Sequence, residues 1–153
     1  MQQEIKTVLE NIERVKRENG ITYPITVVAA TKTVPPDRIN LLPEYGVKIA
    51  GENRVQELLG KYDLVHGVKW HFIGSLQTNK VKYIVDKVDL IHSADREELV
   101  DEIDKRSAKI GKISDVLIEI NTGGEESKSG VASEEAESLA AYVSGKKNVR
   151  LRG

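Results

Sequence analysis

The sequence predicts an α/β fold of the (β/α)8 TIM-barrel type, with about six of the eight strands present. Short β-branched apolar runs alternate with amphipathic segments of helical spacing along the whole chain. Successive apolar runs lie roughly 20 to 30 residues apart, the spacing of βαβ units with parallel strands. No GxGxxG or Walker A motif follows any run, so the usual signs of a nucleotide-binding sheet are missing. An open doubly wound sheet stays as the alternative architecture.

The expected elements follow one another without a linker or a low-complexity segment. Strands are expected over 25–30, 47–50, 68–73, 88–92, 116–120 and 149–152. Helices are expected over 5–20, from the double proline at 35–36 to about 45, over 55–62 and 79–86, from 95 through 103, and over 133–145. Asp95 with Glu98, and Ser133, are the expected helix N-caps. The strand over 25–30 is expected to be buried.

Composition narrows the class of protein. The chain has 153 residues, 39% hydrophobic and 31% charged, which favours one soluble domain over 1–153. A net charge of −1 gives no basic excess for nucleic acid, and the absence of cysteine excludes disulfides and thiolate ligands. The three histidines lack metal-binding spacing, so no metal site is expected. The charged N-terminus does not resemble a signal peptide, and we expect a cytoplasmic protein without a membrane span.

Polar residues follow each expected strand, where parallel α/β folds gather their chemistry. Lys32 ends the first strand, and it either extends to solvent or reacts. Glu52 and Asn53 follow the second and are alternatively caps of the next helix. His71 lies in the third strand and is alternatively a hydrogen-bonded interior residue. Gly123-Gly124 is more typical of a turn than of a phosphate-binding loop. A lysine amine in a water-poor barrel mouth has a lowered pKa and can attack an aldehyde, most commonly pyridoxal 5'-phosphate (PLP).

Five stretches carry a resemblance to a known family: VVAATKTVPPDRI, IAGENRVQELLGKY, WHFIGSLQTNKVKYI, LIHSADREEL and VLIEINTGGEESKSGV. The sequence resembles the single-domain pyridoxal phosphate homeostasis proteins of the YggS/PROSC type, which share the alanine-racemase-like barrel, fold type III of the PLP enzymes. The resemblance implies a PLP-binding protein that holds its cofactor as a Schiff base on Lys32, without strong catalytic turnover and with PLP-dependent apo-enzymes as partners. The implied cofactor-binding residues are Lys32, Asn53, His71, Ile73, Gly74, Ser93 and Asn121.

Other residues have weaker implied roles. Glu52 would support the barrel mouth, Gln77 and Asn79 would organise the following helix, and Lys128 matches a family position without a firm role. A PLP-dependent racemase-like enzyme is the alternative function, and a fragment that no longer binds PLP is a second alternative.

The resemblance also implies a C-terminal truncation. Family members continue past the final VRLRG stretch with two more strands, whose GMS-type and R-x-G-type motifs supply most of the phosphate contacts. We therefore expect weaker cofactor binding. We also expect an incomplete barrel whose open sheet edges favour oligomers.

Overall fold

Six parallel strands pair in chain order in the computed structural model, which describes residues 1–123 and 129–153. They are β1 (Ala29–Ala30), β2 (Ile49–Glu52), β3 (Lys69–Phe72), β4 (Leu90–Ala94), β5 (Ser114–Ile118) and β6 (Val149–Leu151). A doubly wound sheet reverses its strand order, whereas a barrel keeps the order of the chain. The uninterrupted order β1 to β6 therefore confirms the predicted barrel-type sheet and removes the alternative.

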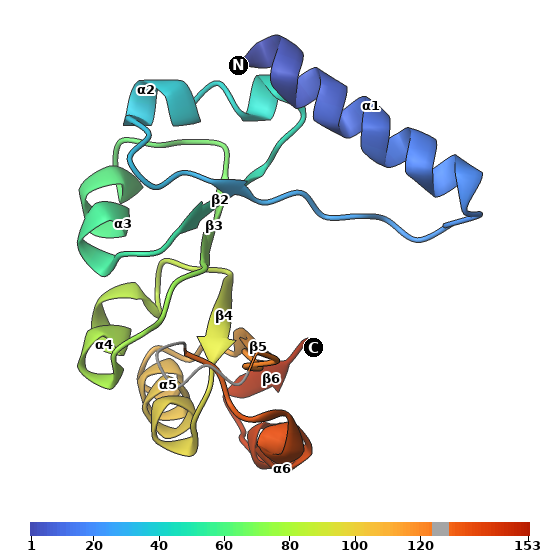
Figure 1. Ribbon diagram of the computed structural model, residues 1–153. Helices are drawn as coiled ribbons and strands as arrows, with labels where there is room; N and C mark the ends of the chain where they lie inside the picture. Colours follow the sequence, from blue (N-terminus) through green and yellow to red (C-terminus); the bar gives the residue numbers. More distant parts are fainter. Residues whose placement is uncertain (124–128) are drawn as a thin grey trace.

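Helices alternate with these strands and lie along one side of the curved sheet (Figure 1). They are α1 (Gln2–Glu18), α2 (Pro36–Ile39), α3 (Val55–Tyr62), α4 (Val81–Ile84), α5 (Glu97–Lys109) and α6 (Ala136–Ser144), with short 3-10 turns η1 (Pro43–Tyr45), η2 (Thr78–Lys80) and η3 (Ser133–Glu135). Among the described residues, no helix combines the length and the apolar character needed to cross a bilayer.

The helix expected over 35–45 is broken into α2 and η1. Pro43 has no amide hydrogen, so it cannot continue the hydrogen bonding of α2, and η1 starts at this residue. Gly46 then ends η1 with a φ of 87°, a conformation that glycine adopts without a steric penalty.

The expected helix caps at Asp95 and Ser133 are wrong. Arg96 is the N-cap residue of α5 and makes no side-chain cap, while the Asp95 carboxylate accepts a hydrogen bond from the Arg96 guanidinium at 2.5 Å. Because the Asp95 carboxylate binds Arg96, it does not cap the start of α5. Ser133 is already the first residue of η3, and it does not cap α6.

The core lies between the sheet and the helices. Ala50, Trp70, Phe72, Ile91 and Val116 alternate along the strands and are buried against the helix layer. Each large apolar side chain removed from water in this way contributes about 1.5–3 kcal/mol.

The expectation of a buried strand over 25–30 is wrong, because only Ala29–Ala30 pairs and Ile25 is 43% exposed. Within the described chain β1 has a neighbour on one side alone, so little covers the residues that precede it.

Candidate functional site

The carboxyl ends of the strands meet along one edge of the sheet. We call the residues at and just after these ends, 31–33, 52–54, 73–75, 93–95 and 119–121, the rim. Ala30 pairs with Gly51, and Gly51 pairs with His71. Two residues further along each chain stand Lys32, Asn53 and Ile73, so the pairing brings these three predicted residues to one level of the rim.

Asn53 and Gly74 are in close backbone contact. A Cβ added at Gly74 would lie 2.7 Å from Asn53 Cα and 2.8 Å from Asn53 Cβ, so a side chain at 74 would force the two strand ends apart. The Ile73 amide donates to the carbonyl oxygen of Glu52 at 2.9 Å, which continues the ladder past the ends of β2 and β3. The Asn53 side chain does not cap α3, whose N-cap is Arg54, so the capping alternative is wrong for Asn53.

A register shift in β4 places Ser93 at the rim. Ile91 pairs with Val116, but Ala94 pairs with Ile118, so β4 has one residue more than β5 between these two pairs. Paired residues share a face of the sheet, and Ile91 and Ala94 are both buried against the helices. His92 and Ser93 between them therefore turn to the inner face. A β-bulge is a known way of redirecting a side chain next to a functional site.

Asn121 stands at the rim after β5. Its amide donates to the carbonyl oxygen of Val131 at 2.9 Å, and a Cβ at Gly130 would lie 2.7 Å from the Asn121 nitrogen. The chain that returns at 129–131 thus packs directly against Asn121. Residues 124–128, including Gly124 and Lys128, lie outside the described residues.

His71 lies within β3, two residues before the rim residue Ile73, and it contacts a second histidine. Its Nδ1 is 3.0 Å from Nε2 of His92, and both rings line a hollow of about 630 Å³ on the inner face of the sheet. Burial, and then the proximity of His92, lowers the pKa of His71 to about 4, and burial also lowers the pKa of His92. Both rings are therefore neutral at pH 7, and one donates to the other. His71 is thus the hydrogen-bonded interior residue that the sequence offered as its alternative role.

Glu52 is fully buried and does not cap α3. Its Oε1 accepts hydrogen bonds from Thr31 Oγ1 at 2.8 Å and from Lys61 Nζ at 2.7 Å. Lys61 comes from α3, and sequence reasoning missed both it and Thr31. The one available signal was the spacing of Glu57 and Lys61, four residues apart on a helix that follows Glu52. Lys32 itself is exposed, so the water-poor surroundings expected for its amine are not found in the described chain.

Buried polar atoms without a hydrogen-bond partner collect at the rim. In the described part of the chain they are Glu52 Oε2, Asn53 Oδ1, Ser93 Oγ and Glu119 Oε2. A buried polar atom left unpaired costs about 1–3 kcal/mol, and folded proteins keep such atoms rarely. All four stand within one residue of the ends of β2, β4 and β5. This concentration indicates a polar ligand at the rim.

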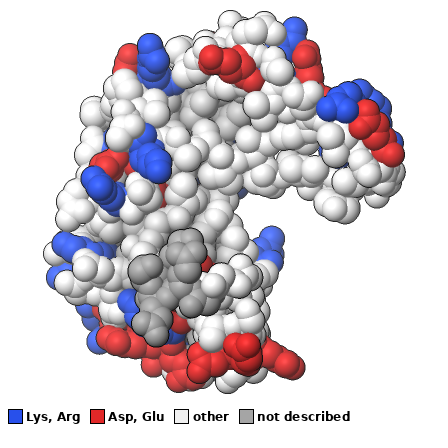
Figure 2. Space-filling view, viewed as in Figure 1, with Lys and Arg blue, Asp and Glu red and all other residues white. Residues whose placement is uncertain are grey.

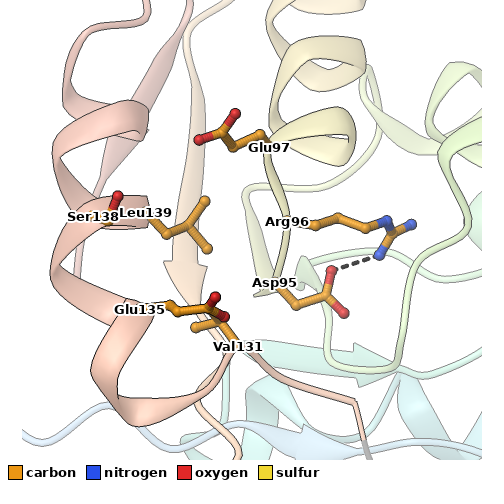
Figure 3. A pocket seen from close by; sticks show the side chains of 7 residues that line it. All are labelled: Asp95, Arg96, Glu97, Val131, Glu135, Ser138 and Leu139. Carbon is orange, nitrogen blue, oxygen red and sulfur yellow. Dashed lines mark hydrogen bonds and ion pairs between the residues drawn. The ribbon is translucent and has the colours of Figure 1, made fainter.

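Another hollow lies between the starts of α5 and α6 (Figure 3). Asp95, Glu97 and Glu135 place three carboxylates around it, and the Arg96 side chain points away from α6. Arg96 donates to the carbonyl oxygen of Leu76 at 3.0 Å. Among the described residues, no group of three or more histidine or carboxylate side chains could hold a metal ion. This hollow has neither a reactive amine nor an unpaired buried polar atom, and we do not consider it the candidate site.

Comparison with known proteins gives a consistent result. Residues 4–153 match the family described as "Alanine racemase, N-terminal domain". The chain is 47% identical over 152 residues to the pyridoxal phosphate homeostasis protein of Aquifex aeolicus, covering 97% of this chain and 67% of that protein. It is 33% identical over 160 residues to the protein of the same name from Vibrio cholerae, covering 100% of this chain and 68% of that one.

Solved structures share the fold. The crystal structure of an unknown protein from Bifidobacterium adolescentis superposes with a TM-score of 0.89 at 30% identity, over 99% of this chain and 67% of that one. PipY of Synechococcus elongatus, crystallised with PLP bound, gives a TM-score of 0.75 at 26% identity over 92% of this chain and 67% of that chain. An alanine racemase of Clostridium difficile has a TM-score of 0.73 at 14% identity, which shows likeness of fold alone, over 89% of this chain and 37% of that one.

Proposed function

The chain belongs to the pyridoxal phosphate homeostasis proteins, within the alanine racemase N-terminal domain family, and we propose that it binds PLP at the rim. PLP supplies an aldehyde carbon that condenses with a lysine amine. Lys32 would provide that amine. The cofactor would be surrounded by Asn53, His71, Ile73, Gly74, Ser93 and Asn121. Of these, His71 lies within β3, two residues before the rim.

The cluster of unpaired polar atoms is the observation that carries this proposal. PLP has a phosphate, a ring hydroxyl and a ring nitrogen that donates a hydrogen bond when protonated. The oxygens of Asn53 and Glu119 are acceptors, and the Ser93 hydroxyl both donates and accepts. The rim therefore offers acceptors for the ring nitrogen and the ring hydroxyl, whereas the phosphate needs donors that these carboxylate and amide oxygens do not provide. PipY, a structural relative, was crystallised with PLP, which supports the same assignment.

We propose a role in holding and delivering PLP rather than strong turnover. Racemisation needs an acid and a base placed on opposite faces of the substrate carbon. Lys32 is the one rim residue for which the sequence suggests a reactive amine. Incubation with amino acids in deuterated buffer should therefore incorporate no deuterium above the rate of free PLP. Incorporation that disappears in Lys32→Ala would instead identify a racemase-like enzyme.

The delivery part of this role has a direct test. PLP-dependent apo-enzymes are the proposed recipients. PLP loaded on this chain should activate such an apo-enzyme faster than an equal amount of free PLP does. Equal rates with the loaded chain and with free PLP would remove the delivery role.

Trapping of the bound cofactor tests the binding proposal. PLP is titrated into the chain while the visible absorbance is recorded, the adduct is reduced with borohydride, and labelled peptides are mapped. We expect one labelled position, Lys32, and no label at that peptide in Lys32→Ala. Lys48→Ala is the matched control, because Lys48 is also an exposed lysine beside the sheet. No absorbance band, or label scattered over surface lysines, would contradict the proposal.

We also propose that the open sheet edges pair with other copies of the chain. Within the described residues, β1 and β6 each have a strand neighbour on one side alone, and unpaired strand edges favour association. The space-filling view shows the molecule curving around an open side (Figure 2). Sedimentation should show mass increasing with protein concentration. A monomer at every concentration and salt level would remove this proposal.

A further inference from the structure

Lys32 stands in a tight turn with an unusual backbone. The turn spans Thr31 to Val34, and the Val34 amide donates to the carbonyl oxygen of Thr31 at 3.0 Å. Thr33 has a φ of 63° and is the one non-glycine residue with positive φ among the residues described. A β-branched residue avoids this conformation unless its surroundings impose it. Something outside the turn must therefore hold it.

Charged side chains hold the turn from both sides of Lys32, the buried Glu52 and the largely buried Lys61 on one side and the half-buried Glu57 on the other. On one side, Thr31 Oγ1 donates to Glu52 Oε1 at 2.8 Å, and Lys61 Nζ donates to the Thr31 carbonyl oxygen at 2.9 Å. On the other side, the strained Thr33 amide donates to Glu57 Oε2 at 3.2 Å. The flanking residues are thus fixed, while the Lys32 side chain is exposed.

The same charges also bind one another. Lys61 Nζ lies 2.7 Å from Glu52 Oε1 and 3.8 Å from Glu57 Oε2. Glu52 is fully buried, and the Lys61 side chain is 11% exposed. Water screens such a pair poorly, so its geometry is tightly set. One lysine therefore links the carboxylates that fix the residues before and after Lys32.

We propose that Glu52, Glu57 and Lys61 are positioning residues that aim the Lys32 amine at a bound aldehyde. They act through the backbone of the turn and do not touch the ligand. This inference rests on the proposed function of Lys32. It assigns α3 a role in reactivity, which its predominantly surface position would not suggest.

The experiment compares trapping on Lys32 among folded variants. Pyridoxal is the probe, because it carries the aldehyde without the phosphate and so reports the amine alone. The Lys32 amine nitrogen bonds to the aldehyde carbon, the aldehyde oxygen leaves as water, and borohydride supplies a hydride that fixes the bond. We expect Lys61→Met and Glu57→Ala to lower the yield at Lys32 by about 10-fold, the scale of a misplaced reacting group. Lys48→Met and Glu44→Ala, which change exposed side chains, are the controls.

Two rescues separate positioning from mere stability. Lys61→Arg keeps the positive charge and should recover most of the yield. Thr33→Gly added to Glu57→Ala should also recover it, because glycine adopts a positive φ without support. Amide hydrogen exchange at Thr33 and Val34 should accelerate in Glu57→Ala and Lys61→Met, while amides in β3 and β4 should not change. Every yield is taken under conditions where circular dichroism shows the variant folded.

The outcomes divide clearly. Trapping on wild-type Lys32 with unchanged yields in the folded variants would overturn this inference and leave the proposed function standing. The inference would also be overturned if Thr33→Gly did not recover the trapping yield and amide hydrogen exchange at the turn did not change. Absence of any trapping on wild-type Lys32 would overturn the proposed function and the inference with it. Reduced yield, local exchange and both rescues together would support it.

Discussion

The two ends of the same parallel sheet differ in whether their polar groups have hydrogen-bond partners. At the amino end, Lys112 Nζ donates to the carbonyl oxygens of Val85 and Val88 at 2.7 and 2.6 Å, and Arg150 binds Asp115 at 2.7 Å. At the carboxyl end, the rim contains four buried polar atoms without a partner among the described residues. At one end of the sheet the polar groups bind each other, and at the other end four buried polar atoms have no partner among the described residues, which agrees with the proposed ligand site.

This difference agrees with the physics of parallel α/β folds. Functional residues gather at the carboxyl ends of the strands, whereas residues at the opposite end chiefly serve stability. Unpaired buried atoms destabilise the free chain, so their presence at the rim is an energetic penalty that a bound ligand would remove. One part of the rim is held by an ion pair, Glu52 Oε1 with Lys61 under the Lys32 turn, although Glu52 Oε2 has no partner among the described residues.

Removal of Lys61 should have the largest effect on stability. Lys61→Met leaves the fully buried Glu52 carboxylate without its cation, and we expect the free energy of unfolding to fall by about 3–5 kcal/mol. Lys112→Met at the amino end leaves carbonyl oxygens but no buried charge unpaired, so it should cost about 1–3 kcal/mol. Urea denaturation measures both. An equal or larger loss in Lys112→Met would break the comparison.

Acid should destabilise the chain through the histidine pair between the two ends. A free histidine binds a proton near pH 6.5, but burial lowers the pKa of folded His71 to about 4. Between these values the unfolded chain binds more protons, so stability falls as the pH falls from 6.5 to 4 and this contribution then levels off. The loss should be on the order of 2–3 kcal/mol. Unfolding measured from pH 7 to pH 4 should show a shallower fall in His71→Gln, and an unchanged slope would contradict the assignment.

A side chain at Gly74 should disturb the rim by packing alone. Gly74→Ala places a methyl group 2.7 Å from Asn53 Cα, and we expect an overpacking loss of about 1–3 kcal/mol. Gly60→Ala is the matched control, because nothing lies within 4 Å of its added Cβ and alanine favours the α3 helix. The control should be neutral or stabilising. A neutral Gly74→Ala would show that the strand ends can separate freely.

The strand order and most element positions could be predicted from the sequence. Apolar runs and their spacing follow from local chemistry, as in β3 and α3, and the residues after each strand indicated the rim. Predictions failed where a distant partner decides the local structure. Asp95 pairs with Arg96 and so does not cap α5, and Glu52 is held by Lys61. The burial expected for 25–30 failed because burial depends on neighbouring strands, which a single apolar run cannot reveal.

A pair of serines tests the central claim most directly. Ser93 Oγ at the rim is buried without a partner, while Ser107 Oγ, on α5 beside the amino end of β5, lies 2.8 Å from Ser114 Oγ. In the free chain, Ser93→Ala should be neutral or stabilising by up to about 1 kcal/mol, and Ser107→Ala should destabilise by about 1 kcal/mol. Added PLP should stabilise the wild type more than Ser93→Ala and should stabilise Ser107→Ala as much as the wild type. Equal losses from both serines, with equal responses to PLP, would contradict the account of the rim as a ligand site.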